Sequence, residues 1–221
     1  MSRTPQPEGA RGSLKWIQRA IERGCPELNA PILAATGASA VEWRSPVRAD
    51  AFAEYRDSDF LSLIGAGDLA PVLRDFWPTR GPQWDALGVT NRGDILLVEA
   101  KAHVGEMLSP PTGATGEALQ LIERALASCA AELSATPKAS WSQCFYQYAN
   151  RLAHLAFLRQ QGRPAWLVLV SFVGDDEMGG PRTPEAWAAA YSVMDHVMGL
   201  RARHRLSRWI VHAYPDVSAL Q

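Results

Sequence analysis

The stretch GPQWDALGVTNRGDILLVEAK, residues 81–101, decides the fold of this chain. It predicts two hydrophobic strands joined by the tight turn 91–93, whose final glycine adopts positive φ freely. Residues 95–98 are all aliphatic, so neither face of the second strand is expected to meet water. That pattern is typical of a strand covered on both sides. The stretch therefore predicts a sheet flanked by helices.

The register of this hairpin places three charged side chains together. If Thr90 pairs with Asp94, counting back along both strands puts Asp85 opposite Glu99. Directly opposed residues share a face, with Cβ atoms about 5 Å apart, and two carboxylates there repel unless a proton or a cation lies between them. Lys101 projects from the same face because strand side chains alternate. The pattern predicts a divalent-metal site with a lysine beside it.

Lysine is scarce in this chain, which makes Lys101 notable. Only three of the 22 lysines and arginines are lysines. A lysine at the end of a core strand indicates a need for a compact ammonium group. The alternative is a surface hairpin in which Glu99 and Lys101 are solvated charges, paired with each other. The aliphatic run before them argues against it, since a surface hairpin alternates with polar residues.

Asp85 followed by Glu99-Ala100-Lys101 across a hairpin resembles the core motif of the PD-(D/E)XK, or restriction-endonuclease-like, nuclease superfamily. The resemblance extends over residues 40–215. Within it, Glu54-Tyr55-Arg56-Asp57, Trp77-Pro78 and Tyr146-Gln147-Tyr148-Ala149-Asn150-Arg151 are similar to a group of uncharacterised bacterial members. The chain departs from the pattern in two ways. Trp84 stands where the motif's name has proline, and no basic DNA-binding surface accompanies the motif.

The resemblance implies an α/β fold with a central mixed β-sheet flanked by helices, that is, a restriction-endonuclease-like core. It also implies a catalytic set of Asp85, Glu99 and Lys101. Asp85, Glu99 and the backbone carbonyl of Ala100 would hold Mg²⁺ or Mn²⁺, because hard cations prefer oxygen ligands. Lys101 would orient the attacking water or stabilise the developing charge.

Two further candidates come from outside the hairpin motif. Members of the superfamily often add an acid from an early helix to the metal shell, and we prefer Glu54 to Glu22 for that place because it lies closer to the hairpin in sequence. His103 shares the face of Lys101 if the strand continues that far. It could then be a metal ligand, a proton relay or a phosphate contact. The alternative for His103 is a strand-end histidine facing solvent.

A helix after the motif supplies other substrate-binding candidates. Superfamily members often place a glutamine or basic residue from this helix near the metal, which selects Gln147 and Arg151. An intrahelical hydrogen bond and a surface salt bridge are the alternative for these two. Glu106 is expected to be a solvated loop charge. The segment 201–208 is the one dense basic cluster, suited to a phosphate backbone or to a solvated loop.

Length, charge and cysteine use set further limits. The chain has 221 residues, a net charge of −1 and three cysteines. It is long enough for one large domain, expected over residues 13–221 after a flexible tail at 1–12. An odd number of cysteines without Cys-x-x-Cys spacing predicts a reduced, cytoplasmic location. No apolar run suits a membrane span. The near-neutral charge disfavours reliance on nonspecific phosphate attraction.

Patterning along the chain predicts alternating helices and strands. Helices are expected at 13–24, 28–37, 50–64, 69–76, 115–133, 136–161 and 183–200, and strands beyond the hairpin at 41–44, 166–173 and 209–214. The order of strands within the sheet cannot be deduced from this pattern.

The function expected from these residues is metal-dependent hydrolysis of a nucleic-acid phosphodiester, with DNA favoured over RNA. A second hypothesis is a non-catalytic or partner-dependent module of the same fold that binds nucleic acid or protein, which the near-neutral charge favours. A third is a hydrolase of a smaller phosphate ester. No membrane association is expected, and a protein partner or a homodimer stays open.

Overall fold

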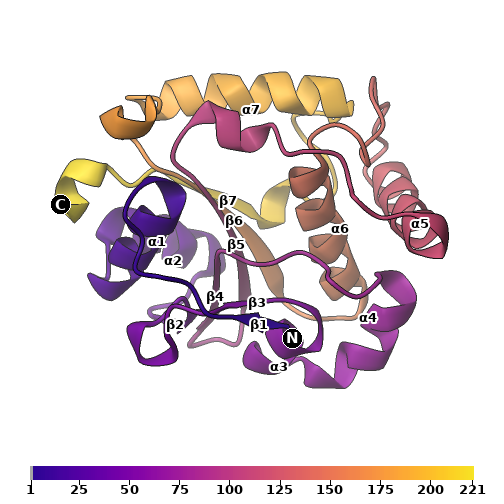
Figure 1. Cartoon of the computed structure of the whole chain (residues 1–221), viewed down its shortest axis with the longest axis horizontal. Helices are drawn as coiled ribbons and strands as arrows, with labels where there is room; N and C mark the ends of the chain where they lie inside the picture. The colour runs from indigo at the N-terminus through magenta and orange to yellow at the C-terminus, as the bar shows by residue number, and fades with distance from the viewer. Residues whose placement is uncertain (1) are drawn as a thin grey trace.

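A computed structural model describes residues 2–221 and shows an α/β protein with a mixed five-stranded sheet (Figure 1). The sheet order is β2-β4-β5-β6-β7. Its strands are β2 (Val41–Ser45), β4 (Ala86–Thr90), β5 (Ile95–Lys101), β6 (Ala165–Ser171) and β7 (Ile210–Ala213). A separate two-stranded sheet joins β1 (Arg3–Thr4) to β3 (Glu54–Tyr55). The coarse fold class predicted from the sequence is confirmed.

Two kinds of strand pairing meet at β5. The strands β2, β4 and β5 are antiparallel neighbours, whereas β5, β6 and β7 run parallel. All seven residues of β5 are buried, including its two charged ones. This agrees with the aliphatic run in its sequence, which indicated cover on both faces.

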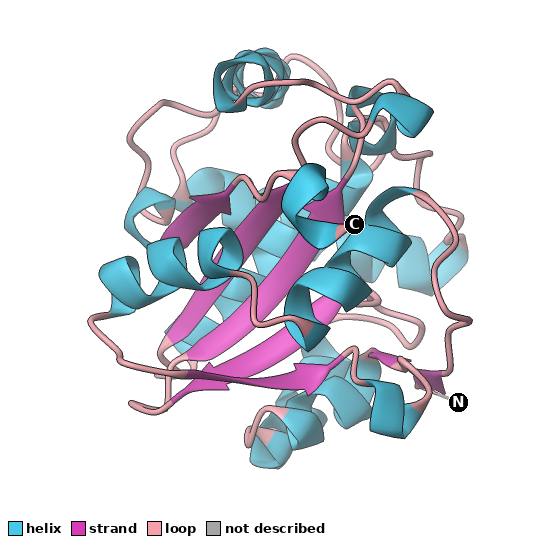
Figure 2. Ribbon diagram, turned by 90° about the vertical axis from the view of Figure 1, so that its left-hand side faces the viewer, coloured by secondary structure: helices cyan, strands magenta, loops and turns pink. Residues whose placement is uncertain are grey.

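Helices cover both faces of the sheet (Figure 2). On one face α1 (Gly12–Glu22) and α2 (Pro26–Thr36) pack over even-numbered residues of β5 such as Leu96 and Val98. The opposite face packs against the remaining helices, which are α3 (Asp57–Leu63), α4 (Ala70–Phe76), α5 (Gly116–Glu132), α6 (Tyr146–Gln160) and α7 (Pro184–Met198). Within the described residues, no helix is both long enough and apolar enough to cross a membrane.

The hairpin between β4 and β5 has the predicted turn and register. The Thr90 N–H donates to the Asp94 carbonyl at 2.9 Å, and Gly93 has φ 84°. The ladder continues in this register as far as the pair Ala86–Val98. The glycine supplies the positive φ that a three-residue hairpin loop requires.

The predicted helix at 50–64 is wrong over its first half. Ala51 and Phe52 have φ of 51° and 48°, in the left-handed region, so a right-handed helix cannot run through them. The chain instead forms β3, and α3 begins at Asp57. Glu54 therefore stands on a strand and not on a helix.

The predicted helix at 136–161 is also wrong over its first ten residues. The N–H groups of Thr136 and Lys138 donate to the carbonyls of Gly199 and Val197, at the end of α7. The start of this segment is therefore bound to another helix, the rest forms bends and turns, and α6 begins only at Tyr146. Tertiary hydrogen bonds override a local capping signal here.

Part of the segment 1–12, which was expected to be a flexible tail, lies along the domain. Strand β1 pairs with β3, and the Gln6 N–H donates to the Ala51 carbonyl. The side chain of Gln18 accepts from the Gly9 N–H and donates to the Pro7 carbonyl. These contacts bring the segment close to Glu54.

Candidate functional site

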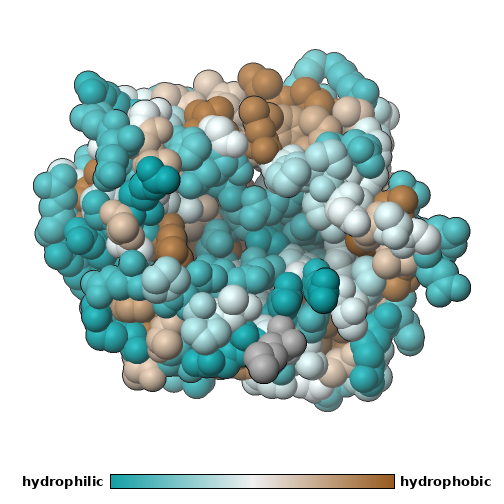
Figure 3. All heavy atoms as spheres, viewed as in Figure 1, coloured by the Kyte–Doolittle hydropathy of each residue, from teal (hydrophilic) through white to brown (hydrophobic). Residues whose placement is uncertain are grey.

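The three residues of the predicted motif converge where β4 begins and β5 ends. The two strands are antiparallel, so Asp85, just before β4, lies beside the last residues of β5. A cleft of about 560 Å³ opens there, and its walls include Asp85, Ala100 and Lys101, with the 105–111 segment and the start of α6 around them. The face drawn in Figure 1 has a hydrophilic hollow near its centre (Figure 3).

The backbone of Asp85 does not continue the hairpin ladder, and its side chain bonds to β5 instead. The chain bends at Asp85, just before β4, and Trp84 pairs with Tyr55 of β3 instead. The carboxylate Oδ2 of Asp85 then accepts the Ala100 N–H at 2.7 Å. Asp85 is thus held at the end of β5 by its side chain, and the prediction that it forms a ladder pair with Glu99 is wrong in that detail.

The electrostatic coupling between the two acids is nevertheless the one predicted. Burial, and then the charge of Glu99, raise the pKa of Asp85 to about 8. Burial also acts to raise the pKa of Glu99, but the charges of Arg151 and Lys101 outweigh it and hold that pKa below its usual value. One acid therefore retains its proton at neutral pH while the other is ionised, a division typical of functional pairs.

Glu99 is enclosed by two cations. The residue is 3 % exposed, Lys101 Nζ donates to its Oε1, and Arg151 Nε donates to its Oε2 at 2.6 Å. Burial opposes the charge on Lys101, but Glu99 and Asp85 raise its pKa. Lys101 and Arg151 both line the cleft, so Glu99 lies directly beneath them.

Arg151 is a buried residue and not a member of a surface salt bridge. It is 2 % exposed, and besides Glu99 it donates to the Gln83 carbonyl at 2.6 Å and to Asn150 Oδ1 at 3.0 Å. Its guanidinium also lies 4.6 Å from the centre of the Trp84 ring. These contacts fix α6 to the segment that carries Asp85.

Gln147, the other candidate from this helix, contacts the motif lysine. Its Oε1 accepts from Lys101 Nζ at 2.9 Å, and its backbone N–H donates to Ser109 Oγ at 2.9 Å. Gln147 and Arg151 are one helical turn apart on α6, which explains why both reach the same ion pair. The structure thus brings both helix candidates to Glu99 and Lys101.

Glu54 lies near the site but is held at its edge. Its Oε2 accepts from Gln83 Nε2 at 2.6 Å and from Gln6 Nε2 at 3.0 Å. Burial raises its pKa, and its charge contributes to the raised pKa of Asp85. Glu22, the other early acid, pairs with Arg48 and takes no part in the site.

His103 lies beyond the end of strand β5, whereas Glu106, expected to be solvated, takes part in hydrogen bonds. Strand β5 ends at Lys101, and His103 precedes a short 3₁₀ turn, where its Nε2 lies 3.7 Å from Glu106 Oε1. Glu106, expected to be solvated, accepts from the Ala102 N–H at 2.6 Å and from Ser13 Oγ at 3.2 Å. It forms part of the cleft wall. Its position after a glycine gave no sign of this role.

The basic segment 201–208 is remote from the motif. It precedes β7, which runs parallel to β5 and β6. The motif stands at the carboxyl ends of these strands, so the basic segment lies at the opposite end of the sheet. One phosphate group cannot contact both.

The motif offers oxygen atoms of the kind that hard cations prefer as ligands. Among residues 2–221, no three His, Cys, Asp or Glu side chains converge as a metal site, and the expected set contains only two carboxylates. In a β-strand, the N–H and the carbonyl of one residue point to the same side. The Ala100 N–H donates to Asp85, so the Ala100 carbonyl is expected on that side as well. Each carboxylate oxygen has two lone pairs, so Glu99 Oε1 retains one beside Lys101.

Comparisons with known proteins identify no relative of this chain. No protein-family model, no curated protein and no solved structure matches the chain. Function can therefore be inferred only from the residues of the site itself.

Proposed function

We propose that this chain is a Mg²⁺- or Mn²⁺-dependent nuclease with a restriction-endonuclease-like core, hydrolysing phosphodiester bonds of DNA in preference to RNA. The observation that carries the proposal is the meeting of Asp85, Glu99 and Lys101 at the end of β5, beside an open cleft. Two acids with divided pKa values and a buried ammonium are costly to assemble, and such perturbed groups in a cleft mark functional sites. The mixed sheet is compatible with this core.

Each residue has a distinct part in the proposed reaction. Asp85, Glu99 and the Ala100 carbonyl would hold the cation, which when bound lowers the pKa of water and offsets charge on the phosphate. Lys101 would hold a proton near the attacking water, and Gln147 positions its Nζ. Arg151 would remain as the counter-ion of Glu99 while Lys101 exchanges partners.

A non-catalytic binding module of the same fold is the second candidate, and one observation favours it. Both oxygens of Glu99 already have cationic partners, so the charge of Glu99 is balanced within the protein. A module of this kind would need no cation to fold. The two candidates differ in whether the cleft binds a divalent ion.

Metal titration followed by cleavage assays separates the two. We expect Mn²⁺ and Mg²⁺ to bind the wild type, to bind Asp85→Asn much more weakly, and to bind Glu117→Gln, an exposed acid of α5, as the wild type does. Plasmid, single-stranded DNA and RNA are then assayed with each ion. Cutting that is lost in Asp85→Asn and Lys101→Met supports the nuclease. Absence of metal binding by the wild type contradicts it and favours the binding module.

A further inference from the structure

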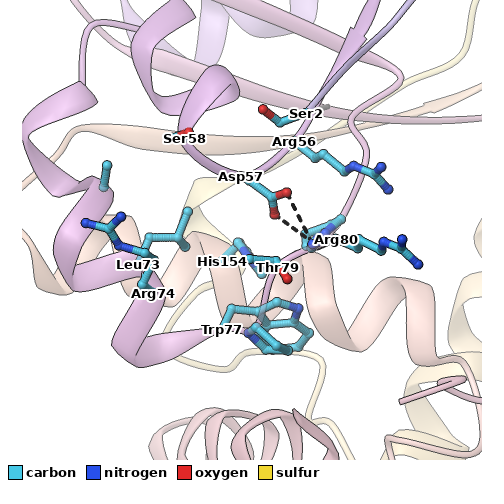
Figure 4. A pocket seen from close by; sticks show the side chains of 14 residues that line it. Ser2, Arg56, Asp57, Ser58, Leu73, Arg74, Trp77, Thr79, Arg80 and His154 are labelled. Carbon is cyan, nitrogen blue, oxygen red and sulfur yellow. Dashed lines mark hydrogen bonds between the residues drawn. The ribbon is translucent and has the colours of Figure 1, made fainter.

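A second pocket, of about 670 Å³, lies one helical turn along α6 from the ion pair of Glu99. Its lining includes Arg56 and Asp57 at the start of α3, Leu73 and Arg74 of α4, the loop 77–82, and His154 of α6. Figure 4 shows His154 between Arg74 on one side and Arg80 on the other. A volume of this size is within the range of small-ligand sites.

The loop that forms one wall is held in a fixed, strained shape. Asp57 Oδ2 accepts the Arg80 N–H at 3.2 Å, and its Oδ1 accepts the Gly81 N–H at 2.9 Å. Asp57 and Arg80 have φ of 53° and 65°, which L-residues rarely adopt. Strain of this kind persists where surrounding contacts impose it, and it is common at ligand-binding loops. The backbone at Arg80 is therefore fixed before any ligand binds.

The pocket is cationic. Within residues 2–221, the side chains of Arg74 and Arg80 form no ion pair with a carboxylate, and Arg56, which has a partner of its own, also lines the pocket. Asp57 is the one acid in the lining, and backbone N–H groups occupy its oxygens. Arg56 and Arg80 extend toward the same side in Figure 4. Guanidinium groups without a carboxylate partner favour a phosphate as their ligand.

His154, in contrast to the arginines, offers a hydrogen-bond acceptor to a ligand. The ring is 1 % exposed, and its Nδ1 lies 2.8 Å from the Asn150 carbonyl, which can only accept, so Nδ1 carries the proton. Burial lowers the pKa of His154 to about 3, which keeps the ring neutral and leaves Nε2 as an acceptor. The rings of Phe76, Trp77 and Trp84 surround it. A ligand group that donates an N–H or O–H to Nε2 among these aromatic rings suits this position.

We propose that this pocket binds a nucleotide through its phosphomonoester, either as a free mononucleotide or as the phosphorylated end of a strand. The arginines receive the phosphate, and His154 accepts from a base amino group or a sugar hydroxyl. The proposal goes beyond cleavage, since it requires neither a metal ion nor Asp85.

The test is calorimetric titration with deoxyadenosine monophosphate, deoxyadenosine and inorganic phosphate in metal-free buffer. Variants Arg80→Gln and Arg74→Gln alter the pocket, Arg201→Gln alters a remote exposed arginine, and Asp85→Asn alters the proposed catalytic site. Circular dichroism confirms that each variant is folded. We expect the nucleotide to bind at least about tenfold more weakly to the pocket variants, the loss typical of one charge-assisted hydrogen bond. Arg201→Gln and Asp85→Asn should bind as the wild type does.

Several results would overturn the proposal. Equal weakening in Arg201→Gln would show a general charge effect, and a nucleoside binding as tightly as the nucleotide would exclude phosphate recognition. Inorganic phosphate binding as tightly as the nucleotide would leave only an anion site. Short oligonucleotides with phosphorylated or hydroxyl ends then identify the source: tighter binding of the phosphorylated end, lost in Arg80→Gln, indicates a strand end.

Discussion

Arg151 Nε donates to Glu99 Oε2 at 2.6 Å, and both side chains are almost completely buried. The pair links α6 to β5, and the Gln83 carbonyl extends the link to the segment before β4. Charges in such a place are costly to desolvate and depend on each other for compensation. The pair therefore has a structural role that is separate from any reaction.

Replacing Arg151 by methionine should destabilise the fold strongly, because Glu99 is left buried with Lys101 alone. Breaking a buried ion pair costs about 3–5 kcal/mol of unfolding free energy. Urea denaturation measures this loss. Arg182→Met is the control, because Arg182 forms an exposed pair with Asp176 whose contribution should not exceed about 1 kcal/mol. A similar effect of the two substitutions would contradict the structural role of Arg151.

Asp85 should make stability depend on pH. Its pKa is about 8 in the folded chain, against about 4 when unfolded, so the folded state holds an extra proton between these values. The contribution of this proton to the free energy of unfolding is complete below pH 4. It is lost as the pH rises from 4 through 8, by up to about 1.4 kcal/mol per pH unit. In metal-free buffer, Asp85→Asn should lack this loss. Urea unfolding at pH 5, 6.5 and 8 tests it, and parallel curves for both proteins would refute it.

Lys101 should compete with a metal ion for Glu99. Its Nζ occupies Oε1, so Lys101→Met frees that oxygen while removing the proposed proton-holding group. We expect Mn²⁺ to bind this variant at least as tightly as the wild type, with cleavage reduced by about 100-fold or more, as for the loss of an acid–base group. Calorimetry and plasmid cleavage measure the two effects. Weaker metal binding by Lys101→Met would contradict this competition between the lysine and the metal ion.

The hairpin could be predicted because its determinants are local. Gly93 fixes the turn, and the turn fixes which residues of β4 and β5 face each other. The convergence of Gln147 and Arg151 on Glu99 was expected from the family resemblance, and helical spacing explains it. What the sequence did not disclose was the turn at Asp85, which depends on the pairing of Trp84 with Tyr55.

The errors share one cause, which is that distant contacts outweigh local signals. Thr136-Pro137 has the pattern of a helix start, yet its backbone bonds to the end of α7. Glu106 looks like a loop charge, yet it binds the Ala102 N–H. The second pocket combines α3, α4, α6 and a loop, so no contiguous motif could have indicated it.

A substitution at Gly199 tests the contact that prevents a helix from beginning at Thr136. It follows α7 with φ 70°, and a Cβ there would overlap the Thr136 carbonyl. Gly162 follows α6 with φ 74° and has open space around it, which makes it the matched control. Gly162→Ala should cost about 1–2 kcal/mol from left-handed strain alone. Gly199→Ala should cost about 3 kcal/mol or more, because overpacking adds to that strain. Urea denaturation of both variants measures the difference, and equal losses would show that the 136–138 segment does not pack against α7 as described.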